Sequence, residues 1–104
     1  MRNKNKLIPE TTTQKPDYGC IKVNILDVES GLLEYENVRA IKIRSKKYQL
    51  VIMKDYLSII GDIEGSVEIE IKSGNIKLEN IVGYYMHRHN QFNLFIKEEI
   101  VNKI

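Results

Sequence analysis

The sequence contains almost no alanine and no tryptophan, since Ala40 is the only alanine among 104 residues. Alanine is the strongest helix former, so its scarcity disfavours a helical fold. Sixteen isoleucines, seven valines and three threonines together make up a quarter of the chain. These β-branched side chains are favoured on strands. The composition therefore predicts an all-β fold, and the length allows one small domain.

Cysteine is nearly absent as well, because Cys20 is the only one. A single cysteine excludes an intramolecular disulfide and a four-cysteine zinc site. It fits a reducing compartment, so we expect a cytoplasmic protein. Sixteen Lys and Arg against fourteen Asp and Glu leave a net charge of only +2. That balance argues against a nucleic-acid partner, which would favour a strongly basic chain.

Long apolar runs are missing too. No run approaches the roughly 20 residues of a membrane-spanning helix. Leu7 and Ile8 are the only consecutive aliphatic residues before residue 20, which is too few for a signal peptide. We therefore expect no membrane insertion, while peripheral association with the cytoplasmic face of a membrane through a complex stays open.

Residues 1–19 are expected to form a flexible, polar N-terminal arm. The arm is mildly basic, because it carries Arg2, Lys4, Lys6 and Lys15. Two interpretations remain for it. It can contact an acidic surface, or it can be a solvated tail without a partner.

From Ile21 onward the hydrophobic pattern has a period of two. Apolar residues alternate with polar ones in several stretches, which predict strands at 21–25, 40–44, 67–72, 76–79, 83–87 and 92–96. With weaker segments included, we expect about eight to ten short strands. Their spacing predicts a small β-sandwich or flattened barrel over residues 20–98. A short tail follows at 99–104, and a short helix is the most structure that we expect in it.

Few residues suggest chemistry. His87 and His89 are separated by one residue, so on a strand both imidazoles would face one side and could hold a metal. The alternative is a surface hairpin with polar tips. Carboxylate pairs such as Glu68 and Glu70 alternate with apolar residues, which places them on exposed strand faces and opposite basic residues such as Lys77. We predict no catalytic residue, no cofactor and no metal, and by elimination a binding function.

Several segments share their order and pattern with one known family. The opening reads IKVNILD at 21–27 and GLLEYENVRAI at 31–41, and the middle reads YQLVIMKDYLSIIG at 48–61. IEGSVEI at 63–69, GYYM at 83–86 and FNLF at 92–95 follow. This string resembles the N-terminal β-sandwich of the ATP synthase epsilon subunit. Met53, Lys54, Tyr56 and Ser58 depart from it, since the family usually has Leu, Pro, His and Pro there.

The resemblance implies a non-catalytic coupling subunit of the central stalk that docks on the gamma subunit and the c-ring. It does not extend to the family's C-terminal helical hairpin, for which we expect no room after the sandwich. The implied partner-binding residues form an apolar loop: Tyr56, Leu57, Ile59 and Ile60. The same four side chains could instead cap the core of the sandwich.

Two other functions stay open. The chain can be a stand-alone interaction module that uses an epsilon-like sandwich for a partner unrelated to ATP synthesis, since a fold does not determine a function. It can also be an enzyme or metal protein built on His87 and His89.

Overall fold

A computed structural model of the chain describes residues 19–99, and every regular element in this part is a strand. The strands are β2 (Ile21–Asp27), β3 (Gly31–Val38), β4 (Ala40–Ser45), β5 (Gln49–Met53), β6 (Ile59–Ile71), β7 (Gly74–Arg88) and β8 (Gln91–Glu99). The predicted all-β fold is confirmed. Residues 19–99 contain no helix that is long and apolar enough to cross a membrane.

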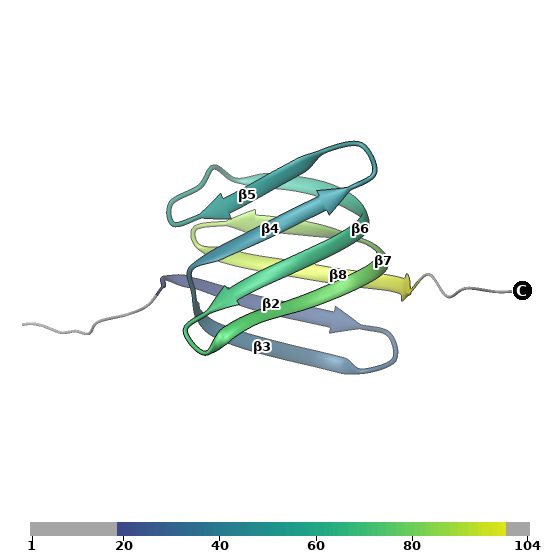
Figure 1. Cartoon of the computed structure of the whole chain (residues 1–104), viewed down its shortest axis with the longest axis horizontal. Coiled ribbons are helices and arrows are strands. Elements are labelled where there is room, and N and C mark those ends of the chain that lie inside the picture. The colour runs from purple at the N-terminus through teal and green to yellow at the C-terminus, as the bar shows by residue number, and fades with distance from the viewer. Residues whose placement is uncertain (1–18, 100–104) are drawn as a thin grey trace, which may run out of the picture.

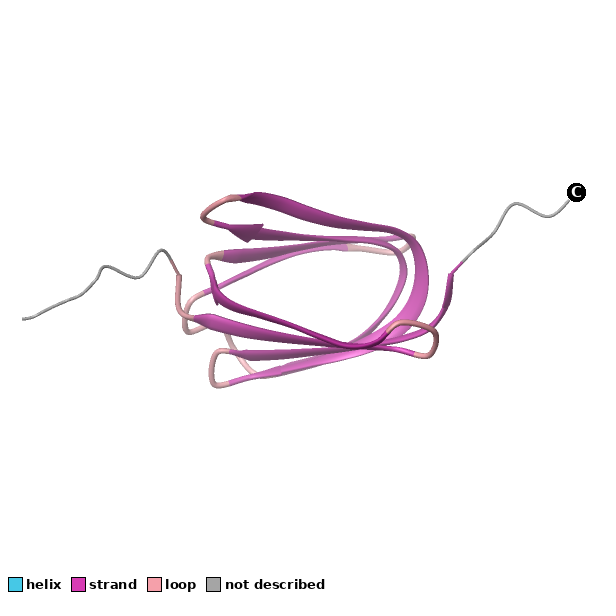
Figure 2. Ribbon diagram, turned by 90° about the horizontal axis from the view of Figure 1, so that it is seen from below, coloured by secondary structure: helices cyan, strands magenta, loops and turns pink. Residues whose placement is uncertain are grey.

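The seven strands form one mixed sheet in the order β3-β2-β8-β7-β6-β4-β5 (Figure 1). All neighbours are antiparallel except β2 and β8, which run parallel. The sheet folds over on itself because β6 and β7 are 13 and 15 residues long and curve from one layer into the other (Figure 2). One half of each long strand continues β8, β2 and β3 in a five-stranded layer. The other half continues β4 and β5 in a four-stranded layer.

Glycines lie where the long strands change layer. The pairing shifts register at Gly65 in β6 and at Gly83 in β7, and such bulges bend a strand. A Cβ on Gly65 would lie 2.0 Å from the carbonyl oxygen of Arg44, and one on Gly83 would lie 2.0 Å from that of Phe95. Both contacts are with backbone atoms, so the neighbouring strand approaches too closely for any side chain.

The core lies between the two layers and follows the predicted alternation. Every second residue of β2 and of β8 is buried, and β4 and β6 supply the facing side chains. The main contributors are Ile21, Val23, Ile25, Ile41, Ile43, Val67, Ile69, Phe92, Leu94 and Ile96. The half-buried strands predicted from period two are therefore confirmed, with the expected faces inward.

The division into strands differs from the prediction of many short ones. Residues 76–79 and 83–87 belong to one continuous strand, β7, with Asn80 in the left-handed region at φ 57°. Residues 59 and 60 begin β6 instead of belonging to the apolar loop that the resemblance implies. A bulge lets a strand pass from one layer to the other without a turn. It also interrupts the alternation of apolar and polar residues, so in the sequence it looks like the end of a strand.

The last strand, β8, extends to Glu99, where Glu98 and Glu99 pair with Val82 and Ile81, so the first residue of the predicted tail at 99–104 belongs to β8. Residues 100–104 of the predicted tail and residues 1–18 of the predicted arm at 1–19 lie outside the described residues.

We expect Gly83→Ala to destabilise the fold by about 1–3 kcal/mol, because the new methyl group must displace the backbone of β8. Urea unfolding followed by circular dichroism measures the loss. Ser73→Ala, in the exposed turn before β7, is the control and should keep the wild-type midpoint. An unchanged midpoint for Gly83→Ala would contradict the close approach of the two strands.

Candidate functional site

A row of apolar side chains crosses the outer face of the five-stranded layer. Leu32 of β3 lies opposite Leu26 of β2, which lies opposite Phe95 of β8, which in turn lies opposite Tyr84 of β7. Met86 follows two residues later on the same face of β7, opposite Ile60 of β6. We call these six residues the outer stripe.

The outer stripe is accessible to a partner. Five of its members are exposed, and Phe95 is half-buried beneath the ring of Tyr84, with the ring centroids 5.5 Å apart. Single exposed apolar residues are common on soluble proteins, but an apolar row that crosses five neighbouring strands is not. Its continuity makes the outer stripe a candidate surface for binding another protein.

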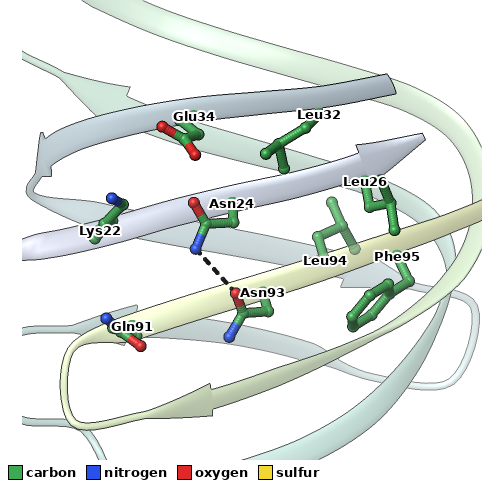
Figure 3. A pocket seen from close by; sticks show the side chains of 9 residues that line it. All are labelled: Lys22, Asn24, Leu26, Leu32, Glu34, Gln91, Asn93, Leu94 and Phe95. Atoms are coloured by element: carbon green, nitrogen blue, oxygen red, sulfur yellow. Dashed lines mark hydrogen bonds between the residues drawn. The ribbon is translucent and has the colours of Figure 1, made fainter. Parts of the chain in front are cut away.

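A hollow of about 450 Å³ lies at the β3 end of the stripe (Figure 3). Its lining is apolar on one side and polar on the other, and consists of Lys22, Asn24, Leu26, Leu32, Glu34, Gln91, Asn93, Leu94 and Phe95. The Asn24 amide donates to Oδ1 of Asn93 across the parallel strands at 3.0 Å. The hollow therefore offers both apolar contact and amide hydrogen bonds to a bound segment.

The loop before β6 is held against the turn between β7 and β8. The backbone N–H of Asp55 donates to Oδ1 of Asn90 at 2.7 Å, and the Asn90 amide donates to Oδ1 of Asp55 at 3.0 Å. The backbone N–H of Tyr56 donates to the carbonyl of Met53 at 3.1 Å. Asp55 takes a left-handed φ of 63° to make this arrangement. The loop thus presents its side chains from a fixed backbone.

The four residues predicted to bind a partner divide into two pairs. Tyr56 and Ile59 are half-buried and pack against the core, as the capping interpretation expects. Leu57 and Ile60 are exposed, as the binding interpretation expects. Ile60 also belongs to the outer stripe, so the loop and the stripe meet at β6.

The two histidines do not come together. His87 is completely buried, with its ring between those of Tyr56 and Phe92 at centroid distances of 6.5 and 6.2 Å. His89 is exposed in the turn after β7, at φ 53°. The strand ends at Arg88, so the shared face predicted for the pair does not exist. Within residues 19–99 no three His, Cys, Asp or Glu side chains gather in a way that could hold a metal ion.

His87 is an unusual core residue because neither ring nitrogen has a hydrogen-bond partner. Removal from water disfavours the charged imidazolium, so burial lowers the pKa of His87 below its ordinary value. The ring is therefore held neutral and packs as an aromatic side chain.

Tyr84 and Tyr85 have opposite roles. Tyr85 is buried, and its hydroxyl is hydrogen-bonded to that of Tyr48 at 3.2 Å. Burial first, and that hydrogen bond second, raise the pKa of the Tyr85 hydroxyl. The Tyr48 hydroxyl also donates to the carbonyl of Asp62, which links β6 to the segment before β5. Tyr85 is thus structural, whereas Tyr84 belongs to the outer stripe.

The predicted position of Lys77 is confirmed, since it lies opposite Glu68 in the β6–β7 register. Its ion pair, however, is with Glu79 at 3.3 Å, and Glu68 accepts a hydrogen bond from the Asn75 amide at 2.6 Å. These groups are exposed or half-buried on the strand faces, and none forms a nucleophile and base pair.

Sequence reasoning missed most of the outer stripe, although a signal for it exists. Each of the five strands carries an apolar doublet, such as Ile25-Leu26 in β2 and Leu94-Phe95 in β8. With a period of two, only one member of each doublet can face the core. The other member must lie on the outer face, and adjacent strands bring these members together.

Comparison with known proteins identifies a fold. No protein-family model and no curated protein matches the sequence. A chain in the cryo-EM structure of Euglena gracilis mitochondrial ATP synthase, OSCP/F1/c-ring, aligns with a TM-score of 0.67 and 17% identity over 82% of this chain and 54% of that chain. A chain in the central stalk/c-ring structure of Tetrahymena thermophila mitochondrial ATP synthase aligns with a TM-score of 0.60 and 14% identity. That alignment covers 75% of this chain and 63% of the other.

These identities show a shared fold. The chain spans a little over half of the first neighbour's length and less than two thirds of the second's. The fold of residues 19–99 is therefore one that occurs in mitochondrial ATP synthase assemblies.

We expect the stability of the protein to fall as the pH drops below about 6.5, the ordinary histidine value retained in the unfolded chain. Because the folded pKa of His87 is lowered, the unfolded state binds a proton that the folded state does not. The contribution of neutral His87 to the free energy of unfolding is complete above that pH. Below it, the contribution decreases with a slope of up to about 1.4 kcal/mol per pH unit, until the pH falls through the lowered pKa of the folded state.

Urea unfolding at pH 5 to 7.5 measures this effect in the wild type, in His87→Phe and in His89→Gln. His87→Phe keeps an aromatic ring without a titrating group, so its stability should depend less on pH. His89→Gln removes the exposed histidine and should behave as the wild type. Parallel curves for the wild type and His87→Phe would contradict a buried neutral imidazole.

Proposed function

We propose that this protein is a non-catalytic docking subunit of an ATP synthase central stalk, similar in role to the epsilon subunit. The observation that carries the proposal is the outer stripe, an apolar surface that crosses all five strands of one layer. The fold shared with chains of two mitochondrial ATP synthase structures supports the choice of assembly.

The two exposed surfaces suit two partners. The outer stripe is broad and lies on a regular sheet, so we assign it to the stalk subunit, gamma. Leu57 stands at one end of the layer on a loop clamped by Asp55 and Asn90, and we assign it to the c-ring. Ile60, at the start of β6, lies where the outer stripe meets this loop and can contact either partner. Tyr56 and Ile59 then support this loop from the core side.

The proposed function needs no cofactor and no reaction. His87 and Tyr85, whose pKa values are displaced, are buried in the core and face no open site. Attachment to a membrane would come through the c-ring and not through this chain.

A stand-alone interaction module is the second candidate. It is favoured by the lack of any match to a family model and by the four departures at Met53, Lys54, Tyr56 and Ser58. In that case the same outer stripe would bind a protein outside an ATP synthase.

Purification of the tagged protein from its native host distinguishes the two candidates. Wild-type protein should retain stalk and ring subunits. Leu26→Glu/Met86→Glu should retain at least about tenfold less, because charges enter the centre of an apolar interface. The control is Val51→Glu/Met53→Glu on β5, whose side chains are 47% and 46% exposed against 46% and 41% for the stripe pair. Different partners for the wild type would favour the stand-alone module, and equal capture by both variants would reject the stripe.

The loop is tested separately. Leu57→Glu should weaken capture of the c-ring while capture of the stalk subunit remains. Val28→Glu, in the turn after β2, is the matched control, because the two residues are 77% and 76% exposed. Loss of the ring with Val28→Glu alone would place the ring contact elsewhere.

A further inference from the structure

The two strands that end the sheet differ in charge along their free edges. Within residues 19–99, β3 pairs with β2 only and β5 pairs with β4 only (Figure 1). β3 carries Glu34 and Glu36 and no basic residue, whereas β5 reads QLVIM and has neither a charge nor a proline. Charged residues and proline protect an edge from pairing with another strand. Of the two edges, that of β5 is therefore the one open to a further strand.

Alternate residues of β5 direct their backbone groups toward the free edge. The N–H of Ser45 donates to the carbonyl of Tyr48 at 2.8 Å, and this pair closes the β4–β5 hairpin. Bonded and non-bonded pairs alternate along an antiparallel ladder, so every second residue of β5, counted from Tyr48, bonds to β4. The backbone groups of Gln49, Val51 and Met53 therefore point away from β4, where another strand can reach them.

The exposed apolar side chains of the four-stranded layer lie on this edge strand. Val51 is the middle residue of β5 and is 47% exposed, and Met53 is 46% exposed on the same face. The next strands inward carry charges on that face, since Lys42 lies opposite Val51 and Glu68 lies opposite Lys42. A strand added beside β5 would thus cover apolar side chains without displacing a charge pair.

A second copy of β5 fits the edge, because an uncharged strand can pair with itself. In an antiparallel pair about a twofold axis through Val51, the two Val51 residues would lie opposite each other and Gln49 would lie opposite Met53. The two Val51 residues would exchange both backbone hydrogen bonds, and the N–H of Met53 would donate to the carbonyl of Gln49. The carbonyl of Met53 already accepts from the N–H of Tyr56 at 3.1 Å.

The charges that flank β5 favour this register. Lys47 precedes the strand and Asp55 follows it, so with the axis at Val51 they lie level with each other in the two copies. Opposite charges stabilise paired strands. A shift of the axis by one residue toward the N-terminus would instead bring Lys46 level with Lys54, and like charges destabilise the pair.

The same charge rule excludes β3 as the site of self-pairing. Two β3 strands paired about a twofold axis would bring Glu34 and Glu36 of one copy close to those of the other. These like charges would oppose the pair. Charge thus selects β5 from the two free edges.

We propose that two copies of this chain form a symmetric dimer in which their β5 strands pair antiparallel through Val51. The pairing joins the four-stranded layers of both copies into one continuous layer and covers Val51 and Met53. A five-residue strand gives a small interface, so the dimer dissociates on dilution. The outer stripe contains no residue of β5, so the dimer goes beyond the proposed function and does not depend on it.

Charge substitutions at Val51 test the twofold contact in the full chain. In sedimentation equilibrium the wild type should reach twice the monomer mass of 12.1 kDa as its concentration rises. Val51→Lys and Val51→Glu should each weaken dimerisation at least about tenfold, because like charges meet at the axis. An equimolar mixture of the two should dimerise again, which also shows that both variants are folded. A wild type that is monomeric up to about 1 mM, or a mixture that stays monomeric, would overturn the proposal.

Two sets of controls locate the contact. Leu32→Lys and Leu32→Glu place the same charges on the β3 edge and should dimerise as the wild type does. Leu26→Glu/Met86→Glu, which tests the outer stripe, should also dimerise normally, so the dimer and the proposed function can fail separately. Loss of the dimer in either set would place the contact on β3 or on the stripe and would reject pairing through β5.

Cross-linking tests the edge without new charges. Cys20→Ser removes the only native thiol. In that background a short bismaleimide should join two copies of Val51→Cys at least about tenfold faster than two copies of Leu32→Cys, because only the first pair lies within the interface. Leu32 is 58% exposed against 47% for Val51, so accessibility alone predicts the reverse order. Equal rates, or faster cross-linking of Leu32→Cys, would overturn the proposal.

Discussion

The close backbone approach at Gly65 and Gly83 is the constraint on which the rest of the structure depends. At these two positions β6 and β7 change layer against neighbouring carbonyl groups that leave no space for a Cβ. If the strands did not bend there, the sheet would stay open and its apolar face would remain in water. The bend places the halves of two strands on opposite sides of one core, so a single sheet serves as both layers of the sandwich.

The inner face could be predicted from the sequence and the outer face could not. Burial repeats every two residues in β2 and β8, and the pattern of isoleucine, valine and leucine shows this directly. A doublet such as Tyr84-Tyr85 is ambiguous, because the sequence does not say which ring faces the core. The answer depends on the phase of the strand, which the bulge at Gly83 resets. The outer stripe depends on the phase of each of its strands, because the phase decides which member of an apolar doublet faces outward.

His87 shows the same limit for a candidate site. Its spacing from His89 suggests a shared strand face, but the strand ends between them and one ring enters the core. The predicted binding loop is a mixed case. Tyr56 and Ile59 turn inward while Leu57 and Ile60 turn outward, because the clamp between Asp55 and Asn90 fixes a backbone path that local pattern does not encode.

The parallel pairing of β2 with β8 joins the first and the last strands of the described chain. Among the strands of residues 19–99, only β8 pairs the β2–β3 hairpin with the rest of the sheet. During synthesis, the edge of β2 that pairs with β8 therefore stays unpaired until β8 has left the ribosome. Contacts between strands so distant in sequence are slow to form. The five-stranded layer, and the outer stripe on it, can therefore form only after β8 has been synthesised.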